Sequence, residues 1–289
     1  PCETIGQWSS SAAVGEYHPY DFDQWAKVRA RPAALAIHTI HDGRLPYRPA
    51  VAVARSRAIA RRVLEADAAD RVIVIPLATL RVVEEVKLPA RPRTVAWHGI
   101  VHRGKGLARL LGAFRQVRRR APDARLVLIG SRGDTAGTRR DFEELAAVRE
   151  PGVEVRCQEY WTVEELVRQL ERADIYCYPD SDDGEQSGAS SDVLGFGRPV
   201  VVSESTKHDE VRPWCVTARP EGLAETLMAL MTDLRLYAEA AVRAWQGATF
   251  RTPERVNRQY RAAIVHAGVI AGPGGWTRAT GGGCQRQRA

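Results

Sequence analysis

The chain has 289 residues, of which 44% are hydrophobic, and its formal net charge is +7. This length provides for a substantial buried core in one large or two ordinary α/β domains, and the composition is that of a globular protein. The positive charge comes almost entirely from arginine, and it favours anionic partners such as nucleic acid, anionic lipid or phosphorylated small molecules. A GC-rich coding sequence would produce the same arginine content.

The cysteines and the hydropathy pattern argue against two further classes of protein. The five cysteines form no Cys-x-x-Cys pair, and an odd number cannot all pair within one chain, which favours a reducing compartment. No run approaches the roughly 20 apolar residues of a membrane-spanning helix, and no secretory signal opens the chain. We therefore expect a cytoplasmic protein, for which peripheral contact with the inner face of a membrane stays open.

Residues 1–88 are predicted to form part of an α/β domain. A helix is expected over Ser56–Ala66, and three apolar runs predict strands at Ala33–Ile40, Ala50–Ala54 and Arg71–Ile75. Three strands leave an exposed sheet edge, and the chain starts abruptly at Pro1, so we expect the first part of this domain to be missing. The linker to the next domain is expected within Val82–Arg93, which is charged and contains two prolines.

Residues 89–235 alternate short apolar runs with amphipathic stretches, which is typical of a parallel sheet covered by helices. The predicted strands are Thr94–His98, Arg125–Ile129, Val153–Cys157, Ile175–Tyr178 and Pro199–Val202. The predicted helices are Leu107–Arg119, Arg139–Val148, Thr162–Glu171 and Ser190–Phe196. We therefore predict a doubly wound, Rossmann-like domain, whose ligand would bind beyond the carboxyl ends of the strands.

The rest of the chain is predicted to be helical and then irregular. Helices are expected over Leu223–Met231, Leu234–Ala248 and Pro253–Ala267. We expect residues 236–268 to pack back toward the N-terminal domain. The glycine-rich residues 269–289 are expected to be a disordered tail.

The segment Tyr178–Val202 carries the most informative motif, in the order strand, loop, helix, turn and strand. Small residues at the expected helix start, Ser187, Gly188 and Ala189, would expose backbone N–H groups toward a diphosphate. Gly184 and Gly188 would let such a ligand approach the main chain closely. Read alone, an acidic loop before a helix is more often a cap than a ligand site.

This segment resembles the donor site of family 4 glycosyltransferases, which have the GT-B fold of two Rossmann-like domains. Gly184-Glu185-Gln186-Ser187-Gly188-Ala189 is similar to a Gly-Glu-Thr-Ser-Gly-Ala variant of the family motif, and Gly197-Arg198-Pro199-Val200-Val201 to its closing strand. The resemblance implies that Glu185 contacts the donor hexose and that Asp192 holds the ribose. These two acids are seven positions apart here and eight in the commonest form of the motif.

A second loop strengthens the resemblance. Trp97-His98-Gly99 and Lys105-Gly106 are similar to the first strand-to-helix loop of the family's donor domain. The resemblance implies that Gly99 and Lys105 bind the donor diphosphate. The family commonly has an arginine at the position of Ile100, and we expect Arg103 to supply the second cation instead.

Three further residues are expected at the nucleotide, and one at the reacting sugar. Gly130 is predicted to lie beside the nucleotide, and Tyr160 or Trp161 either flanks the base or is an ordinary surface or core aromatic. Ala36-Ile37-His38-Thr39-Ile40-His41-Asp42 resembles an acceptor-side strand of the family. His41 would then line the catalytic cleft, although a lone histidine is as often structural.

The resemblance implies a retaining, metal-independent glycosyltransferase without a cofactor. It would move a hexose from a UDP- or GDP-sugar to a glycan, lipid or small-molecule acceptor, as in polysaccharide biosynthesis, and no nucleic acid is expected as a partner. Asp180-Ser181-Asp182 matches the spacing of a manganese site in another glycosyltransferase fold, but the rest of the chain argues against that role. A GT-B sugar-nucleotide epimerase and a non-catalytic nucleotide- or nucleic-acid-binding protein are the alternatives.

Overall fold

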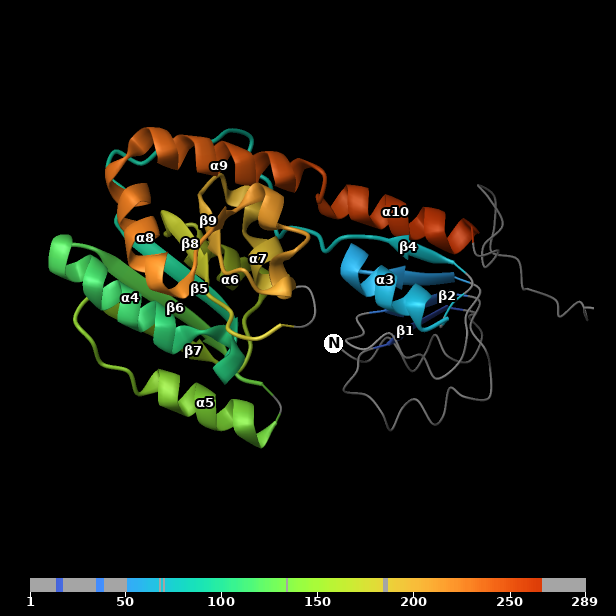
Figure 1. Cartoon of the computed structure of the whole chain (residues 1–289), viewed down its shortest axis with the longest axis horizontal. Helices are drawn as coiled ribbons and strands as arrows, with labels where there is room; N and C mark the ends of the chain where they lie inside the picture. Colours follow the sequence, from blue (N-terminus) through green and yellow to red (C-terminus); the bar gives the residue numbers. More distant parts are fainter. Residues whose placement is uncertain are drawn as a thin grey trace, which may run out of the picture. The chain divides into compact units, whose positions relative to one another are not determined.

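The computed structural model describes residues 14–17, 35–38, 51–67, 69, 71–133, 135–183 and 187–266. The chain divides into two compact units, residues 1–75 with 257–289 and residues 76–256 (Figure 1). His41, Gly184–Gln186 and the predicted tail lie outside the described residues. No helix in these ranges is long and apolar enough to cross a membrane.

The first unit contains a parallel sheet in the order β1-β2-β3-β4. Its strands are β1 (Val14–Tyr17), β2 (Leu35–His38), β3 (Val51–Ala54) and β4 (Val72–Val74). Helix α3 (Arg57–Glu65) joins β3 to β4, begins at the capping hydroxyl of Ser56, and buries Ile59, Ala60 and Val63. The three predicted strands and the helix are confirmed. The additional strand β1 was not predicted, because its sequence Val-Gly-Glu-Tyr has no apolar run.

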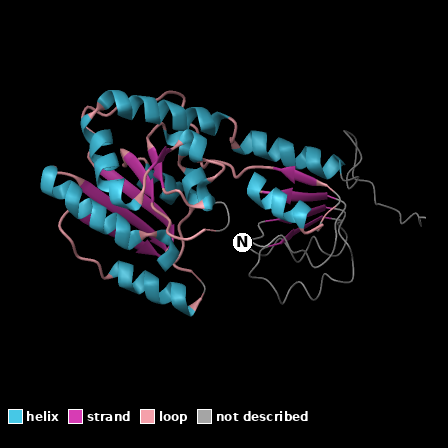
Figure 2. Cartoon of the chain, viewed as in Figure 1, coloured by secondary structure: helices cyan, strands magenta, loops and turns pink. Residues whose placement is uncertain are grey.

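The second unit contains a six-stranded, wholly parallel sheet in the order β10-β9-β8-β5-β6-β7 (Figure 2). Its strands are β5 (Thr94–Ile100), β6 (Arg125–Ser131), β7 (Val153–Gln158), β8 (Ile175–Tyr178), β9 (Val200–Val202) and β10 (Val216–Thr217). The helices are α4 (Leu107–Arg120), α5 (Ala136–Ala146), α6 (Val163–Leu170), α7 (Gly188–Asp192), α8 (Leu223–Thr232) and α9 (Leu234–Thr249). Helix α10 (Pro253–His266) begins in the second unit and belongs to the first unit from Asn257 onward. Single 3₁₀ turns are η1 (Arg103–Lys105), η2 (Leu194–Phe196), η3 (Thr206–His208), η4 (Arg212–Trp214) and η5 (Pro220–Gly222).

Two predicted helices differ from the structure because of their caps. The helix expected from Arg139 begins three residues earlier, where the Thr135 hydroxyl accepts a hydrogen bond from the Thr138 N–H. The helix expected over Ser190–Phe196 is instead the short α7 followed by η2, and Gly197 ends it in the left-handed conformation at φ 65°.

The segment between the two units packs on the second one. The backbone N–H groups of Leu80 and Val83 donate to the carbonyls of Asp192 and Gly195, and the Thr79 N–H donates to Arg251. The boundary therefore falls at Ile75, before the expected linker within Val82–Arg93. The predicted C-terminal region 236–268 is likewise divided: α9 packs on η2, whereas α10 belongs to the first unit from Asn257 onward.

The strand order creates a topological switch point between β5 and β8. From β5 the chain moves outward to β6 and β7, and it then returns to place β8 on the other side of β5. Right-handed crossovers put α4 and α5 on one face of the sheet and α6 and α7 on the other. In sheets of this kind ligands bind beyond the carboxyl ends of the strands at the switch point, so a ligand is expected at the loops that follow β5 and β8.

A close backbone contact holds these two loops against each other. Gly106 begins α4 in the left-handed conformation, with φ 65°, and a Cβ atom at this position would lie 1.9 Å from the carbonyl oxygen of Pro179. Only glycine therefore lets the loop after β5 lie against the end of β8.

Gly106→Ala and Gly112→Ala should change stability in opposite directions. At Gly106 the left-handed conformation alone costs an alanine about 1–2 kcal/mol, and the clash with Pro179 adds to it. At Gly112, inside α4, nothing lies within 4 Å of an added Cβ, so alanine should raise the free energy of unfolding by about 0.5–1 kcal/mol. Urea unfolding of both variants measures these free energies of unfolding. The same change in both variants would contradict the close contact of Gly106 with Pro179.

Candidate functional site

An ion pair crosses the switch point between β5 and β8. Lys105, at the end of η1, places its Nζ 3.1 Å from Oδ1 of Asp180, which follows β8. The Asp180 side chain is fully buried, and that of Lys105 is 14% exposed. The pair therefore joins the two loops at the edge of the sheet where a ligand is expected.

His208 completes the surroundings of the Asp180 carboxylate. Its Nε2 lies 3.1 Å from Asp180 Oδ2, and its Nδ1 lies 3.1 Å from the Ser190 hydroxyl on α7. Burial alone would raise the pKa of Asp180, but the His208 hydrogen bond and the charges of Lys105 and His208 outweigh it and hold the pKa at about 2. The carboxylate is thus an anion at neutral pH, and it links the loops after β5, β8 and β9.

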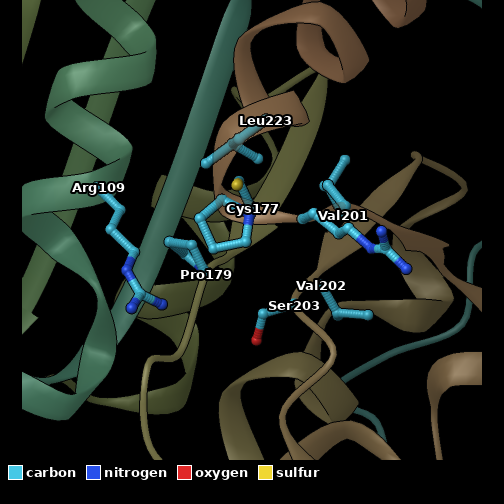
Figure 3. Close-up of a pocket in the computed structure, with 10 residues that line it drawn as sticks. Arg109, Cys177, Pro179, Val201, Val202, Ser203 and Leu223 are labelled. Atoms are coloured by element: carbon cyan, nitrogen blue, oxygen red, sulfur yellow. The ribbon is translucent and has the colours of Figure 1, made fainter.

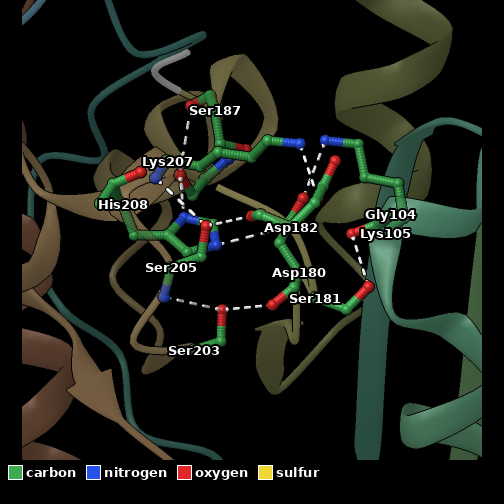
Figure 4. Close-up of polar contacts among 12 residues, drawn as sticks. Gly104, Lys105, Asp180, Ser181, Asp182, Ser187, Ser203, Ser205, Lys207 and His208 are labelled. Carbon is green, nitrogen blue, oxygen red and sulfur yellow. Dashed lines mark hydrogen bonds and ion pairs between the residues drawn. The ribbon is translucent and has the colours of Figure 1, made fainter. Parts of the chain in front are cut away.

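Further hydrogen bonds hold the acidic loop after β8 on both sides (Figure 4). The Ser181 N–H donates to the Gly104 carbonyl in the loop after β5, at 2.8 Å. In the loop after β9, the Ser203 and Ser205 hydroxyls donate to the carbonyls of Asp180 and Asp182. The position of the acidic loop is therefore set by its two neighbours.

A second lysine faces the same loop. Lys207, in η3, places its Nζ 2.7 Å from Oδ1 of Asp182, and its backbone carbonyl accepts the Ser187 N–H at 2.8 Å. His102, at the start of η1, is half-buried among these groups. Its pKa is lowered by burial and by the charges of Lys105 and Lys207, which exceed the opposite effects of the two aspartates. Both lysines, both aspartates and His102 therefore form one cluster.

Asp192 is held in a second, neighbouring chain of hydrogen bonds. Its Oδ2 lies 3.2 Å from Nε2 of the buried His98, whose Nδ1 lies 2.6 Å from the Tyr178 hydroxyl. An ionised carboxylate only accepts hydrogen bonds, so Nε2 donates to Asp192, while Nδ1 pairs with the Tyr178 hydroxyl. These hydrogen bonds, which come from His98 on β5 and Tyr178 on β8, fix the orientation of the Asp192 carboxylate.

The structure brings some of the other predicted residues together and leaves others apart. Gly99, at φ 144°, lies against Ala189 at the start of α7, so these two predicted residues are brought together. The Ser187 N–H is engaged by Lys207, and Gly188 follows it at the start of a helix of only five residues. Arg103 is 78% exposed and pairs with Asp141 of α5 rather than with the lysine cluster.

The predicted base-side residues also separate into two environments. Trp161 is buried, and its indole N–H donates to the Gly130 carbonyl at 3.1 Å, so in this structure both are parts of the core. Tyr160 and Ile100 are exposed at the ends of β7 and β5. They are the apolar side chains that this edge of the sheet offers to a ligand.

The sequence interpretation missed Lys207 and His208 and assigned no charge partner to Asp180 and Asp182. The expectation that ligands bind beyond the carboxyl ends of the strands could have found them, because Ser203–Glu210 follow a predicted strand at the same edge of the sheet. Asp180 and Asp182 each contact a lysine, and among the described residues no group of three or more His, Cys, Asp or Glu side chains has an arrangement that could hold a metal ion.

A small pocket lies beside this cluster but has a different character (Figure 3). It is lined mainly by apolar groups, including Cys177, Pro179, Val201 and Leu223, and also by Arg109 and Arg219. Burial raises the pKa of the Cys177 thiol well above its usual value, so this thiol is not a nucleophile. The polar cluster, and not this pocket, is the candidate site.

Asp180→Asn should destabilise the protein by about 2–3 kcal/mol at pH 7, because it removes the buried anion that Lys105 and His208 contact. The folded pKa of Asp180, about 2, is below the ordinary value of 3.8, so this stabilisation is complete above pH 3.8 and is lost as the pH falls toward 2. The stability difference from the parent protein should therefore shrink over that range, as measured by urea unfolding at several pH values.

The matched control is Asp123→Asn, which changes an exposed carboxylate paired with Arg91 and Arg93. Its effect at pH 7 should be much smaller, because exposed ion pairs contribute little. Equal stability of the parent protein and Asp180→Asn at pH 7 would contradict the role given to the buried pair.

Comparisons with known proteins agree with this arrangement. Residues 92–233 match the family model described as glycosyl transferases group 1, whereas no curated protein matches the chain. A UDP-forming α,α-trehalose-phosphate synthase from Burkholderia xenovorans shares 12% identity and a TM-score of 0.64, over 88% of this chain and 74% of that one.

Two further solved structures give the same result. The α,α-trehalose-phosphate synthase (UDP-forming) of Burkholderia vietnamiensis shares 10% identity with a TM-score of 0.63, over 90% of this chain and 72% of that one. The α,α-trehalose 6-phosphate synthase of Burkholderia multivorans shares 11% identity with a TM-score of 0.58, over 76% of this chain and 60% of that one. The chain spans less than two thirds of the latter protein. The predicted GT-B architecture is confirmed, and residues 92–233 are similar to the group 1 glycosyltransferases.

Proposed function

We propose that this chain binds a nucleoside-diphosphate sugar at the Lys105 cluster and transfers its hexose to an acceptor. The observation that carries the proposal is the position of Lys105, a largely buried cation at the switch point between β5 and β8. Nucleotides bind at this place in doubly wound sheets, and a diphosphate is the part of a sugar nucleotide that needs a fixed cation.

The chemistry assigned to the site is electrostatic. When the bond between the sugar and the diphosphate breaks, negative charge grows on the leaving phosphate, and a cation already fixed beside it stabilises the transition state. Lys105 is held in this way, because Asp180 orients its amino group and His208 orients Asp180. The protein therefore does not have to reorganise as the charge develops.

Other residues would position the donor. Asp192 would accept hydrogen bonds from the ribose hydroxyls through the carboxylate oxygen that His98 does not contact. Tyr160 and Ile100 offer an exposed apolar surface for the base. The roles of Glu185 at the hexose and of His41 in the cleft rest on the family resemblance alone.

The donor is proposed to be a UDP- or GDP-sugar, and transfer to proceed with retention and without a metal or another cofactor. UDP-sugars are the first candidates, since the similar solved structures include UDP-forming enzymes. The acceptor is proposed to be a glycan, a lipid or a small molecule. The enzyme is proposed to be cytoplasmic, and a lipid-linked acceptor would bring it to the inner face of the membrane.

Lys105→Ala should weaken the binding of UDP- or GDP-sugars by about 10- to 100-fold, the effect of losing one charge-assisted hydrogen bond. Isothermal titration calorimetry of the whole chain measures the affinity, and product analysis measures transfer. Lys105→Met preserves the buried stem of the side chain, so it tests the charge separately from the packing.

The matched control is Lys87→Ala, because Lys87 is 77% exposed and its amino group pairs with the exposed Glu85. It should bind the donor like the parent protein.

Titration with single-stranded nucleic acid at several salt concentrations tests the non-catalytic alternative. Salt-sensitive binding of nucleic acid, combined with no affinity for any sugar nucleotide, would overturn the proposed function. Epimerisation of the bound sugar without transfer would favour the epimerase alternative.

A further inference from the structure

Lys207 is withdrawn from solvent in the same manner as Lys105. Three lysines lie in the described part of the chain, at positions 87, 105 and 207. The Lys207 side chain is 11% exposed, against 14% for Lys105 and 77% for Lys87. Burying an ammonium group is costly unless it is paired with an anion. The fold nevertheless buries most of two such groups at one place, and each is paired with an aspartate.

The amino groups of the two lysines converge on the acidic loop from opposite sides. Lys105 comes from the loop after β5 and Lys207 from the loop after β9, and Figure 4 shows both amino groups turned toward the aspartates between them. The pKa of His102 responds to both lysines and both aspartates, which places all four charges within range of one point. A doubly charged group bound there would meet two cations.

The two aspartates differ in how firmly they are held. Asp180 is buried and contacts Lys105 and His208, so its carboxylate is a fixed part of the fold. The Asp182 side chain is 44% exposed and lies against Gly104, where an added Cβ atom would be 2.2 Å from its Oδ2. Its backbone carbonyl is fixed by the Ser205 hydroxyl, so the carboxylate can turn away from Lys207 while the loop stays in place.

We propose that Lys207 is the second cation for the donor diphosphate, and that the Asp182 carboxylate occupies its place until the donor binds. This inference rests on the proposed function. The alternative second cation, Arg103, is exposed and paired with Asp141. A partly exposed ion pair such as Asp182–Lys207 is weak, whereas a lysine–phosphate contact in a sheltered site is stronger, so the exchange favours the donor.

The test compares variants of Lys207 and Asp182 in the full chain by calorimetry with UDP, GDP and inorganic pyrophosphate. Lys207→Ala should weaken the binding of each diphosphate about tenfold or more, and Lys207→Arg should restore most of the affinity. Lys207→Met keeps the buried stem and replaces Lys207→Ala if the alanine variant melts at a lower temperature. Uridine and guanosine, which lack phosphate, should bind the parent protein and the Lys207 variants equally.

Asp182→Asn should act in the opposite direction. Removing the competing carboxylate should tighten diphosphate binding by roughly two- to fivefold, the range expected for an exposed ion pair. In the Lys207→Met background the same substitution should have no effect, because no cation is left to release. Lys87→Ala again serves as the lysine control.

The outcomes separate this inference from the proposed function. If Lys105→Met loses affinity while Lys207→Met binds like the parent protein, the role of Lys207 is overturned and the proposed function stands. Weaker binding by Asp182→Asn would overturn the counterion exchange, since it would make Asp182 a part of the binding site. If the parent protein binds none of the diphosphates, both proposals fall.

Discussion

The buried carboxylate of Asp180 is the interaction on which the rest of the site depends. A charge removed from water must be matched by partners, and here the partners come from two different loops, Lys105 after β5 and His208 after β9. Because Asp180 itself follows β8, satisfying this one anion determines the relative positions of three loops. His208 also reaches Ser190, so the start of α7 belongs to the same network. The geometry of the candidate site is thus a consequence of electrostatic pairing among the protein's own side chains.

Most of the second unit could be predicted from local patterns. The runs that became β5, β6, β7, β8 and β9 are short, apolar and separated by amphipathic stretches, because both faces of a parallel sheet are covered. The strands β1 and β10 were missed, since a strand of two to four residues is defined by its partner rather than by its own composition. Helix starts depended on which hydroxyl forms the cap, and Thr135 and Ser187 were identified only by their hydrogen bonds.

The candidate site was predictable only in part, for a related reason. Lys105 and Asp192 stand in motifs that are read along the chain, and the structure places both at the switch point. The contacts of Lys207 with Asp182 and of His208 with Asp180 join residues from separate loops, so they follow from the order of the strands, which the sequence does not state. Trp161 illustrates the opposite case, since an aromatic residue at a promising loop became part of the core by donating to Gly130.

The short segment that follows the first unit holds the backbone of Asp192, the residue that is proposed to bind the ribose. The Thr79 hydroxyl donates to the Asp192 carbonyl at 2.8 Å and accepts from the Gly195 N–H, while the Leu80 N–H donates to the same carbonyl. The backbone of Asp192, whose carboxylate is proposed to bind the ribose, is therefore hydrogen-bonded to the segment that follows β4. Because Thr79 and Leu80 hold the backbone of Asp192, a displacement of this segment would also displace the carboxylate that is proposed to bind the ribose.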